Sequence, residues 1–325
     1  MRVESWSASR ERYELERQVI LLKAELADWN RYFFVYSNPA YTGFFRDDGS
    51  MPPPRSDPFW ICRDEEIIGG VVIAPNVLEK LFFIPPFADW EGIVRQLADT
   101  LLHWSDRGRP VTAYGMLPDL AELLAGTGFW PGVRRRWMQR PTSSFEQEPD
   151  DAYETASVVM HREGGSIRIG SDTEIALFLH RSLTRRTEAL RGRQASFSQY
   201  VAQVQRCARA SSTDTAAASS LVYDRRTHAL TGVCLISMRQ GLPFVDSLMV
   251  HPGYSRRGIA TAMVKRALTL LNQRGYPLLR LRVTEGNPAE SVFRRLGFMA
   301  APPEVSRMFL GGPPQFPLTD ALPLL

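Results

Sequence analysis

The chain has 325 residues, of which 44% are hydrophobic and 23% charged, and its formal net charge at pH 7 is +4. The length is about twice that of a typical domain and the composition is that of an ordinary globular protein, so two domains are expected. No apolar run approaches the ~20 residues of a membrane-spanning helix. The start Met1–Ser5 also lacks the apolar core of a signal peptide, so we expect a cytoplasmic protein without membrane contact.

The cysteines Cys62, Cys207 and Cys234 lie far apart and lack the short paired spacing that zinc and redox sites require. Reduced, buried thiols and no metal site are therefore expected. The positive charges are nearly all arginine, which indicates a bias in residue usage and not a design for binding polyanions.

In the first half, apolar residues at spacings of three and four predict a helix at about 9–29, with Leu15, Val19, Leu22 and Leu26 on one face. A proline-rich break follows at Pro52–Pro54. Beyond it, periodicity and turn residues predict strands at 59–62, 67–74 and 81–84, a helix at 90–104, a strand at 111–114, a helix at 118–125 and a strand at 133–138.

The acidic stretch Glu146–Asp151 contains a proline and has no periodicity, so it predicts a linker. The expected parts are a first domain at 1–145, a linker at 146–157, a second domain at 158–312 and a proline-rich tail at 313–325. In the second domain we expect strands at 221–223, 231–238, 244–250 and 278–283, and helices at 258–272 and 288–296, the last ending at Gly297.

The two halves share this order of elements and also align residue by residue. Without any gap, the alignment sets Gly92 opposite Gly258, Pro86 opposite Pro252 and Lys80 opposite Asp246. A second match, with a small change of spacing, sets Gly128-Phe129 opposite Gly297-Phe298. The sequence therefore predicts a duplicated fold.

The loop after the strand at 244–250 has the chemistry of an anion site. Gly258 and Ala260 are small enough for the main chain to approach a phosphate closely, and Arg256 and Arg257 add positive charge at the start of a helix. A pyrophosphate group fits these properties.

This loop resembles motif A of the GNAT N-acetyltransferase superfamily, Gln/Arg-x-x-Gly-x-Gly/Ala, with Ser255 in place of the first Gln or Arg. Asn287-Pro288-Ala289 leading to Phe293 and Gly297-Phe298 is similar to the last helix of that family. The resemblance covers about 166–310. It implies an α/β (α+β type) fold of two GNAT-like domains, each a mixed, mostly antiparallel twisted sheet flanked by helices.

The resemblance further implies that acetyl-CoA is the co-substrate. Its acetyl group would be transferred by direct attack of the primary amine of a small molecule. The expected cofactor-binding residues are Leu248, Met249, Val250, Ser255, Arg256, Arg257, Gly258, Ile259, Ala260, Thr261, Asn287 and Phe293. In the first half, Asp89-Trp90-Glu91 stand opposite Ser255-Arg256-Arg257 and would repel a phosphate. We therefore expect the first domain to be a degenerate repeat with a structural or substrate-shaping role.

For catalysis, Asp246 stands where some members of this family carry a catalytic carboxylate, and it is the candidate base. The alternative is that Asp246 only satisfies backbone donors; Glu285 and His180 are weaker candidate bases. The family's usual acid is a tyrosine, but Phe293 occupies its position, which leaves Tyr276, Ser291 or a water as alternatives.

For the acceptor, the arginine-rich segment His180–Arg193 suggests that Arg185 and Arg186 bind a carboxylate or phosphate beside the amine. The alternative is a solvated helix face. Because Phe293 removes the usual acid, a non-catalytic acyl-CoA sensor or partner-binding module is a second function class. Nucleic-acid binding is not expected, since strand alternation sends Arg134 and Arg136 away from Arg135. We expect a monomer or homodimer.

Overall fold

The structure is a computed structural model that describes residues 4–45, 54–106, 108–146, 150–163, 166–187 and 196–311, and of residues 162, 163, 166–168 and 183–187 it describes the backbone alone. The chain divides into two compact units. Unit 1 comprises Met1–Arg136 and Ala301–Phe316, and unit 2 comprises Trp137–Ala300 and Pro317–Leu325. No helix of the described part is long and apolar enough to cross a membrane.

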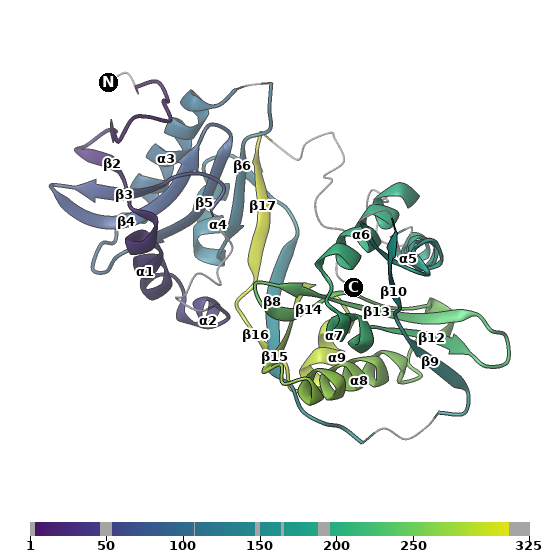
Figure 1. Ribbon diagram of the computed structural model, residues 1–325. Coiled ribbons are helices and arrows are strands. Elements are labelled where there is room, and N and C mark those ends of the chain that lie inside the picture. Colours follow the sequence, from purple (N-terminus) through teal and green to yellow (C-terminus); the bar gives the residue numbers. More distant parts are fainter. Residues whose placement is uncertain are drawn as a thin grey trace. The chain divides into compact units, whose positions relative to one another are not determined.

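Unit 1 is a sheet with helices on both faces (Figure 1). Its strand order is β1 (Arg12–Glu14), β2 (Val19–Lys23), β3 (Pro58–Arg63), β4 (Glu66–Ala74), β5 (Val77–Phe83), β6 (Thr112–Met116) and β17 (Glu304–Leu310), with the short β7 (Phe129–Pro131) also pairing with β17. The pairs are antiparallel except β5 with β6.

The two faces of this sheet have separate apolar cores. Helices α3 (Trp90–Trp104) and α4 (Pro118–Ala125) cover one face, where Ile93, Leu97 and Leu124 are fully buried. Helix α1 (Leu26–Tyr36), followed by α2 (Pro39–Thr42), covers the other, where Trp29 packs against Phe82. Both α3 and α4 have the bounds that the sequence predicts.

The predicted helix at 9–29 is wrong. The segment contains two strands, and helix begins only at Leu26. Val19–Lys23 pairs with β3, because buried and exposed residues alternate there with the period of a strand. Arg17 and Gln18 have positive φ values and form the turn between the two strands. Leu22 and Leu26, expected on the buried helix face, are 42% and 41% exposed.

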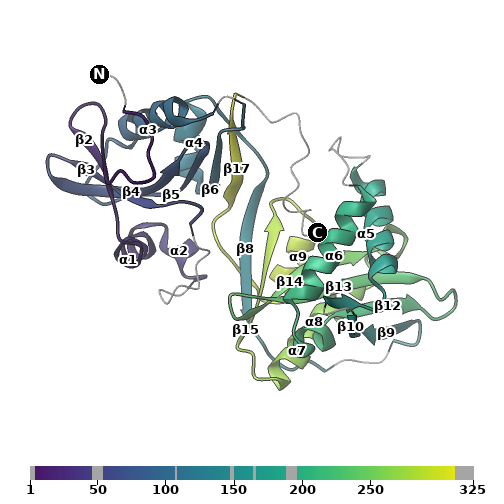
Figure 2. The ribbon, with the colours of Figure 1, turned by 45° about the horizontal axis from the view of Figure 1, so that its top comes forward.

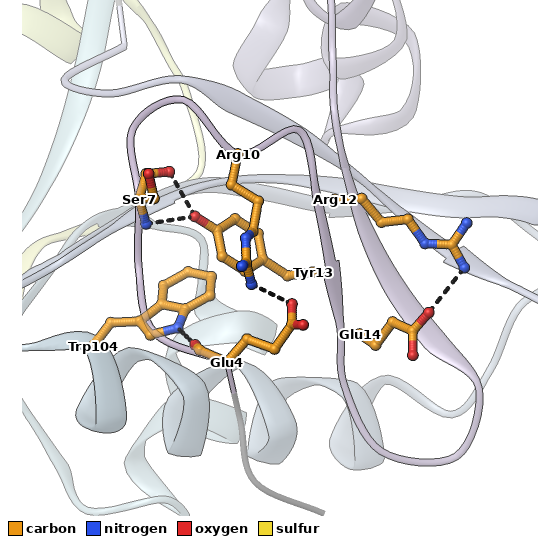
Figure 3. A network of polar contacts seen from close by, with 7 residues as sticks. All are labelled: Glu4, Ser7, Arg10, Arg12, Tyr13, Glu14 and Trp104. Atoms are coloured by element: carbon orange, nitrogen blue, oxygen red, sulfur yellow. Dashed lines mark hydrogen bonds and ion pairs between the residues drawn. The ribbon is translucent and has the colours of Figure 1, made fainter.

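The start of the chain is held on unit 1 by a polar and aromatic network (Figure 3). The Trp104 indole donates to the Glu4 carbonyl at 2.8 Å, and the Tyr13 hydroxyl donates to the Ser7 carbonyl at 2.7 Å. Trp6 stacks on Tyr13 with 5.6 Å between the ring centroids. These contacts hold residues 4–14 against the rest of unit 1.

The strands of unit 2 also carry helices on both faces (Figure 2). Its strand order is β8 (Arg134–Pro141), β15 (Leu278–Thr284), β14 (Leu242–Val250), β13 (Leu230–Arg239), β12 (Ser220–Asp224) and β9 (Tyr153–Ser157). The short β16 (Met299–Ala300) pairs with β8, and β10 (Met160–Glu163) pairs with β11 (Ser166–Ile169) in a separate hairpin.

Helices α8 (Ile259–Gln273) and α9 (Ala289–Arg295) pack on one face of this sheet, and α5 (Asp172–Thr187) and α6 (Phe197–Ala210) pack on the other. Helix α7 (Thr213–Ala218) precedes β12. Alternation along β14 divides its side chains between the two cores, since Leu248 packs with α8 while Met249 packs with α6.

The units differ from the expected domains at the strands that end each half of the sequence. From Trp137 onward β8 belongs to unit 2, although it ends the first half, and β17 belongs to unit 1, although it ends the second. In addition, β9 lies within the expected linker at 146–157 and pairs with β12. Periodicity predicts a strand but not its partner. The expected boundaries at 145 and 158 therefore do not account for β8 joining unit 2 or for β17 joining unit 1.

Both units carry the same irregularity in the sheet, at residues that the alignment of the halves sets opposite each other. The parallel pairing of β5 with β6 ends at Glu79, and that of β14 with β15 ends at Val245. In each case the next residue, Lys80 or Asp246, lies in a β-bulge. A bulge changes the direction of a side chain and ends strand pairing. The two halves therefore share the position of a β-bulge as well as the order of their elements.

Candidate functional site

The candidate site begins where β14 and β15 part beyond Val245. The His251 N–H donates to the Thr231 carbonyl at 2.8 Å, which fixes the phase of the β13–β14 ladder. Because N–H groups alternate along a strand, those of Leu248 and Val250 point to the edge away from β13, while that of Met249 points to β13. Leu248 and Val250 therefore present main-chain donors beyond the last β14–β15 pair, and Met249 does not.

The loop after β14 turns its main chain twice into the left-handed region. Arg256 has φ of +65° and Gly258 of +83°, and Gly258 is the N-cap residue of α8. Such a change of hand directs successive N–H groups to one side, which forms an anion-binding concavity. A Cβ added at Gly258 would meet no protein atom within 4 Å, so the space beside this residue is open.

The start of α8 has donors but no internal acceptor for them. Its first ladder bond runs from the Ala262 N–H to the Gly258 carbonyl at 2.9 Å, so the N–H groups of Ile259, Ala260 and Thr261 precede the ladder. Within this fully described loop and helix, no side chain caps α8 and its first turn carries no acid. Together with the helix dipole, these donors favour a bound anion.

The side chains around the loop divide into charged and structural ones. Ser255, Arg256 and Arg257 are exposed, whereas the Ile259 side chain is 5% exposed and packs in the core, so Ile259 offers only its main chain. Arg257 lies 3.4 Å from the Tyr153 hydroxyl, and this hydrogen bond raises the pKa of Arg257. Its guanidinium also stacks 5.0 Å from the ring centroid of Tyr254.

The equivalent helix of unit 1 is closed by its own carboxylate. Asp89 is the N-cap residue of α3, and its Oδ1 accepts from the Gly92 N–H at 3.1 Å. Its Oδ2 lies 3.5 Å from the Arg63 guanidinium, and Glu91 adds a second acid in the first turn. In unit 1 a protein carboxylate therefore occupies the place that an anion would take in unit 2.

Comparisons with known proteins match part of unit 2 to a family. Residues 188–298 match the model of the family described as Acetyltransferase (GNAT) family. The C-terminal half of the chain contains a GNAT domain. No curated protein matches the sequence as a relative.

Solved structures extend the GNAT fold over nearly the whole chain. A GCN5-related N-acetyltransferase from Sphaerobacter thermophilus matches at 16% identity, over 95% of this chain and 100% of that one, with a TM-score of 0.60. The GCN5-related glucosamine N-acetyltransferase region of a fungal multidomain β-N-acetylglucosaminidase matches at 13% identity, over 91% of this chain and 38% of that one, with a TM-score of 0.53. Unit 1 is thus a GNAT-like repeat whose counterpart of the α8 loop is closed by Asp89.

Asp246 lies in the bulge of the GNAT domain, at the point where β14 and β15 part. Its side chain is 8% exposed and forms an ion pair with Arg239 of β13. The Cys207 thiol of α6 lies beside this carboxylate. Burial raises the pKa of Cys207 well above the ordinary value, and the negative charge of Asp246 raises it further. The carboxylate thus has a charged partner and a fixed place beside the open edge of β14.

The weaker candidate bases lie elsewhere in unit 2. His180 packs its ring 5.7 Å from that of Tyr200, between α5 and α6. Glu285 is exposed and follows the end of β15. Arg239 was missed from the sequence; its position, seven residues before Asp246 across the β13–β14 hairpin, is the signal that points to it.

Tyr276 and the residues of the last helix that the sequence singled out make contacts within unit 2. Phe293, expected beside the cofactor, is 2% exposed and packs edge-on to Phe298 at 5.4 Å, so it is a core residue. The Asn287 side chain accepts from the Ala289 N–H at 2.9 Å at the start of α9. The Ser291 hydroxyl donates to the Pro288 carbonyl, and the Tyr276 hydroxyl donates to Asp214 at 3.2 Å.

Arg185 and Arg186 are in the last turn of α5, but their side chains lie outside the described part of the structure. Their expected role in acceptor binding stays a prediction. In the described residues, no group of three or more His, Cys, Asp or Glu side chains is placed to hold a metal ion.

The cysteines provide a test of burial. Cys62, Cys207 and Cys234 are buried, and burial raises the pKa of each thiol, that of Cys234 to about 12. Because the thiolate is the reactive form, a raised pKa lowers the fraction of each thiol that is reactive, about tenfold for each pKa unit above the pH. At pH 8 we expect the native protein to react with a disulfide reagent at least ~10-fold more slowly than a free thiol. Absorbance of the released aromatic thiol measures this, and fast reaction of the native chain would contradict it.

Proposed function

We propose that the GNAT domain of unit 2 is an acetyl-CoA-dependent N-acetyltransferase that acts on the primary amine of a small molecule. The observation that carries this proposal is the contrast between two equivalent helices. The start of α8 has main-chain donors, Arg256 and Arg257, and no acid, whereas α3 starts on Asp89. A pyrophosphate is the part of acetyl-CoA that such a start favours.

In the proposed complex, the N–H groups from Gly258 to Thr261 bind the pyrophosphate, with Arg256 and Arg257 adding charge. Leu248 and Val250 on the open edge of β14 bind the pantetheine arm through the main chain. A main-chain N–H at that edge polarises the thioester carbonyl and stabilises the oxyanion that forms when the amine attacks.

The amine must lose a proton before it attacks. An alkylammonium with a pKa of ~10.4 is almost entirely protonated at pH 7. Asp246 accepts this proton, directly or through a water, and the amine nitrogen then forms its bond to the acetyl carbon. The nitrogen gives up its second proton to solvent, and as the tetrahedral intermediate collapses, the C–S bond breaks and CoA leaves as a thiolate. Since an alkyl thiol has a pKa of ~8.5, this thiolate leaves without an enzyme acid and takes its proton from solvent.

A second candidate function is acyl-CoA binding without turnover. The observation that favours it is the position of Phe293, which is buried where the family places a tyrosine acid. The two described hydroxyls considered as substitutes, those of Tyr276 and Ser291, are directed to Asp214 and to the Pro288 carbonyl. Under this second function the protein would act as a sensor or as a partner-binding module.

Calorimetry with acetyl-CoA and a thiol-release assay over a panel of primary amines separate the two functions. Transfer predicts binding of acetyl-CoA and an acceptor-dependent release of CoA together with an acetylated amine. Binding with no release for any amine would support the sensor. No binding at all would contradict both.

The loop arginines allow a direct prediction. Replacing both, Arg256→Ala with Arg257→Ala, removes two charge-assisted contacts to phosphate at an exposed site, so acetyl-CoA affinity should fall about 10- to 100-fold. Calorimetric titration measures the change. The matched control is Arg31→Ala with Arg95→Ala, which removes two exposed arginines of unit 1 and should leave the affinity unchanged. Equal losses in both double variants would refute the proposed site.

A further inference from the structure

A cluster of three arginines and two aromatic rings lies on the same face of unit 2 as Asp246, and we call it the arginine cluster. Its members are Arg239, Arg280, Arg282, Trp137 and Phe244. The Arg239 guanidinium pairs with Asp246 and lies 4.0 Å from the ring centroid of Phe244, which packs edge-on to Trp137 at 5.7 Å. The guanidinium groups of Arg280 and Arg282 lie 6.0 and 5.8 Å from the Trp137 ring centroid.

The register of the sheet places Arg282 across from Asp246. Phe244 pairs with Arg280 and Val245 with Leu281, so the next residues along the two strands are Asp246 and Arg282. These are the first residues beyond the end of the pairing. A carboxylate and a guanidinium therefore stand on opposite sides of the point where the strands part.

Both groups lie on the same face of the sheet. Leu279 and Leu281 pack in the core under α8, so alternation directs Arg280 and Arg282 to the opposite face. Arg239 contacts both Asp246 and Phe244, and Phe244 contacts Trp137, which continues the cluster to Arg280 and Arg282 on that face. The face is the one that α5 and α6 cover further along the sheet.

The two strand arginines differ in exposure, and this suggests different roles. Arg280 is 1% exposed, and its Nη2 donates to the Arg239 carbonyl at 3.0 Å, which holds the backbone beside the Asp246 partner. Arg282 is partly exposed and can touch a ligand. A buried positive charge behind a partly exposed one strengthens attraction for an anion, because the dielectric constant is low there.

We propose that the acceptor is a compact zwitterion whose carboxylate or phosphate binds Arg282 while its ammonium group faces Asp246. The inference rests on the proposed function and names its substrate class. Paired parallel strands lie ~4.8 Å apart, and the gap widens where they part, so the two charged groups of the acceptor must be only a few bonds apart. A planar guanidinium binds a carboxylate or phosphate with two parallel hydrogen bonds, and a face that carries three arginines and one carboxylate disfavours a polycationic amine.

The test uses matched amines, each as the free acid, the phosphonate and the neutral carboxamide: for example glycine, aminomethylphosphonate and glycinamide. Binding is measured by calorimetry on the full chain saturated with CoA, and acetyl transfer is measured separately. In the wild type, an anionic member should bind at least 10-fold more tightly than its carboxamide. In Arg282→Gln the anionic member should lose about 10- to 100-fold in affinity, while the carboxamide changes less than 3-fold. Arg282→Lys, which keeps the charge, should lose less, and thermal melting shows whether each variant is folded.

Three outcomes would overturn the inference: carboxamides that bind as tightly as the acids, equal losses of acid and carboxamide in Arg282→Gln, or no binding by any member of the panel. The proposed function fails on a different result. If anionic members bind in an Arg282-dependent way but no amine is acetylated, the ligand class stands and the transferase does not.

Discussion

A chain that ends at Ala300 is expected to lose the fold of unit 1. The deletion removes β17, which pairs with β6 and carries the buried side chains of Val305, Met308 and Phe309. Burial of each such side chain contributes about 1.5–3 kcal/mol, so the loss approaches the 5–15 kcal/mol by which a whole domain is stable. The sheet of unit 1 would also gain an unpaired edge at β6.

Tryptophan emission reports this loss. Of the 7 tryptophans in the chain, all but Trp137 belong to unit 1. We expect a red shift of the emission maximum in native buffer and rapid proteolysis of residues 4–136. The matched control is a chain that ends at Gly311, which keeps β17 and should keep the native emission. A native spectrum for the chain ending at Ala300 would show that β17 is dispensable.

Replacement of Asp246 by asparagine is expected to lower kcat of acetyl transfer by about 10²- to 10³-fold, the usual contribution of a positioned base. Affinity for acetyl-CoA should be unchanged, because the loop and the edge of β14 are intact. The deficit should shrink as pH rises toward the pKa of the amine, since more of the acceptor is then neutral without help from the enzyme. Steady-state kinetics across pH measure both effects.

The control for this variant is Asp214→Asn. Asp214 pairs with Arg274 at 2.9 Å and accepts from the Tyr276 hydroxyl, so the change removes a carboxylate of unit 2 outside the proposed centre. Its kcat should stay near the wild-type value. If Asp246→Asn kept more than half of kcat, or if both variants lost activity equally, Asp246 would not be the base.

The sequence predicted best those features that depend on local pattern. Helices α3 and α4 have the expected bounds, and α8 begins beside Gly258 as expected, because helical periodicity and proline at a first turn act over a few residues. The duplicated fold was also predictable, since Lys80 and Asp246 lie in equivalent bulges.

Features set by tertiary partners could not be predicted in this way. Val19–Lys23 has apolar residues at a helical spacing, but pairing with β3 selects the strand. The assignment of β8 to unit 2 and of β17 to unit 1 depends on which strands pair, and no local pattern encodes that. Likewise, the burial of Phe293 follows from its packing against Phe298.

The sequence also could not predict which N–H groups of β14 face its open edge, because this depends on strand pairing. One hydrogen bond, from His251 to Thr231, decides that Leu248 and Val250 face the open edge and that Met249 does not. The arginine cluster depends on register as well, because Arg282 meets Asp246 only through the pairing of Phe244 with Arg280.

The central claim is that the GNAT domain binds acetyl-CoA at the start of α8 and that unit 1 does not bind it, because Asp89 occupies the equivalent place. The stoichiometry of acetyl-CoA binding, measured by calorimetry on the full chain, tests this most directly. We predict one molecule per chain, with binding lost in a variant that introduces the two acids of unit 1 at the aligned positions of unit 2, Ser255→Asp with Arg257→Glu. Two molecules per chain, or full affinity in this double variant, would contradict the account.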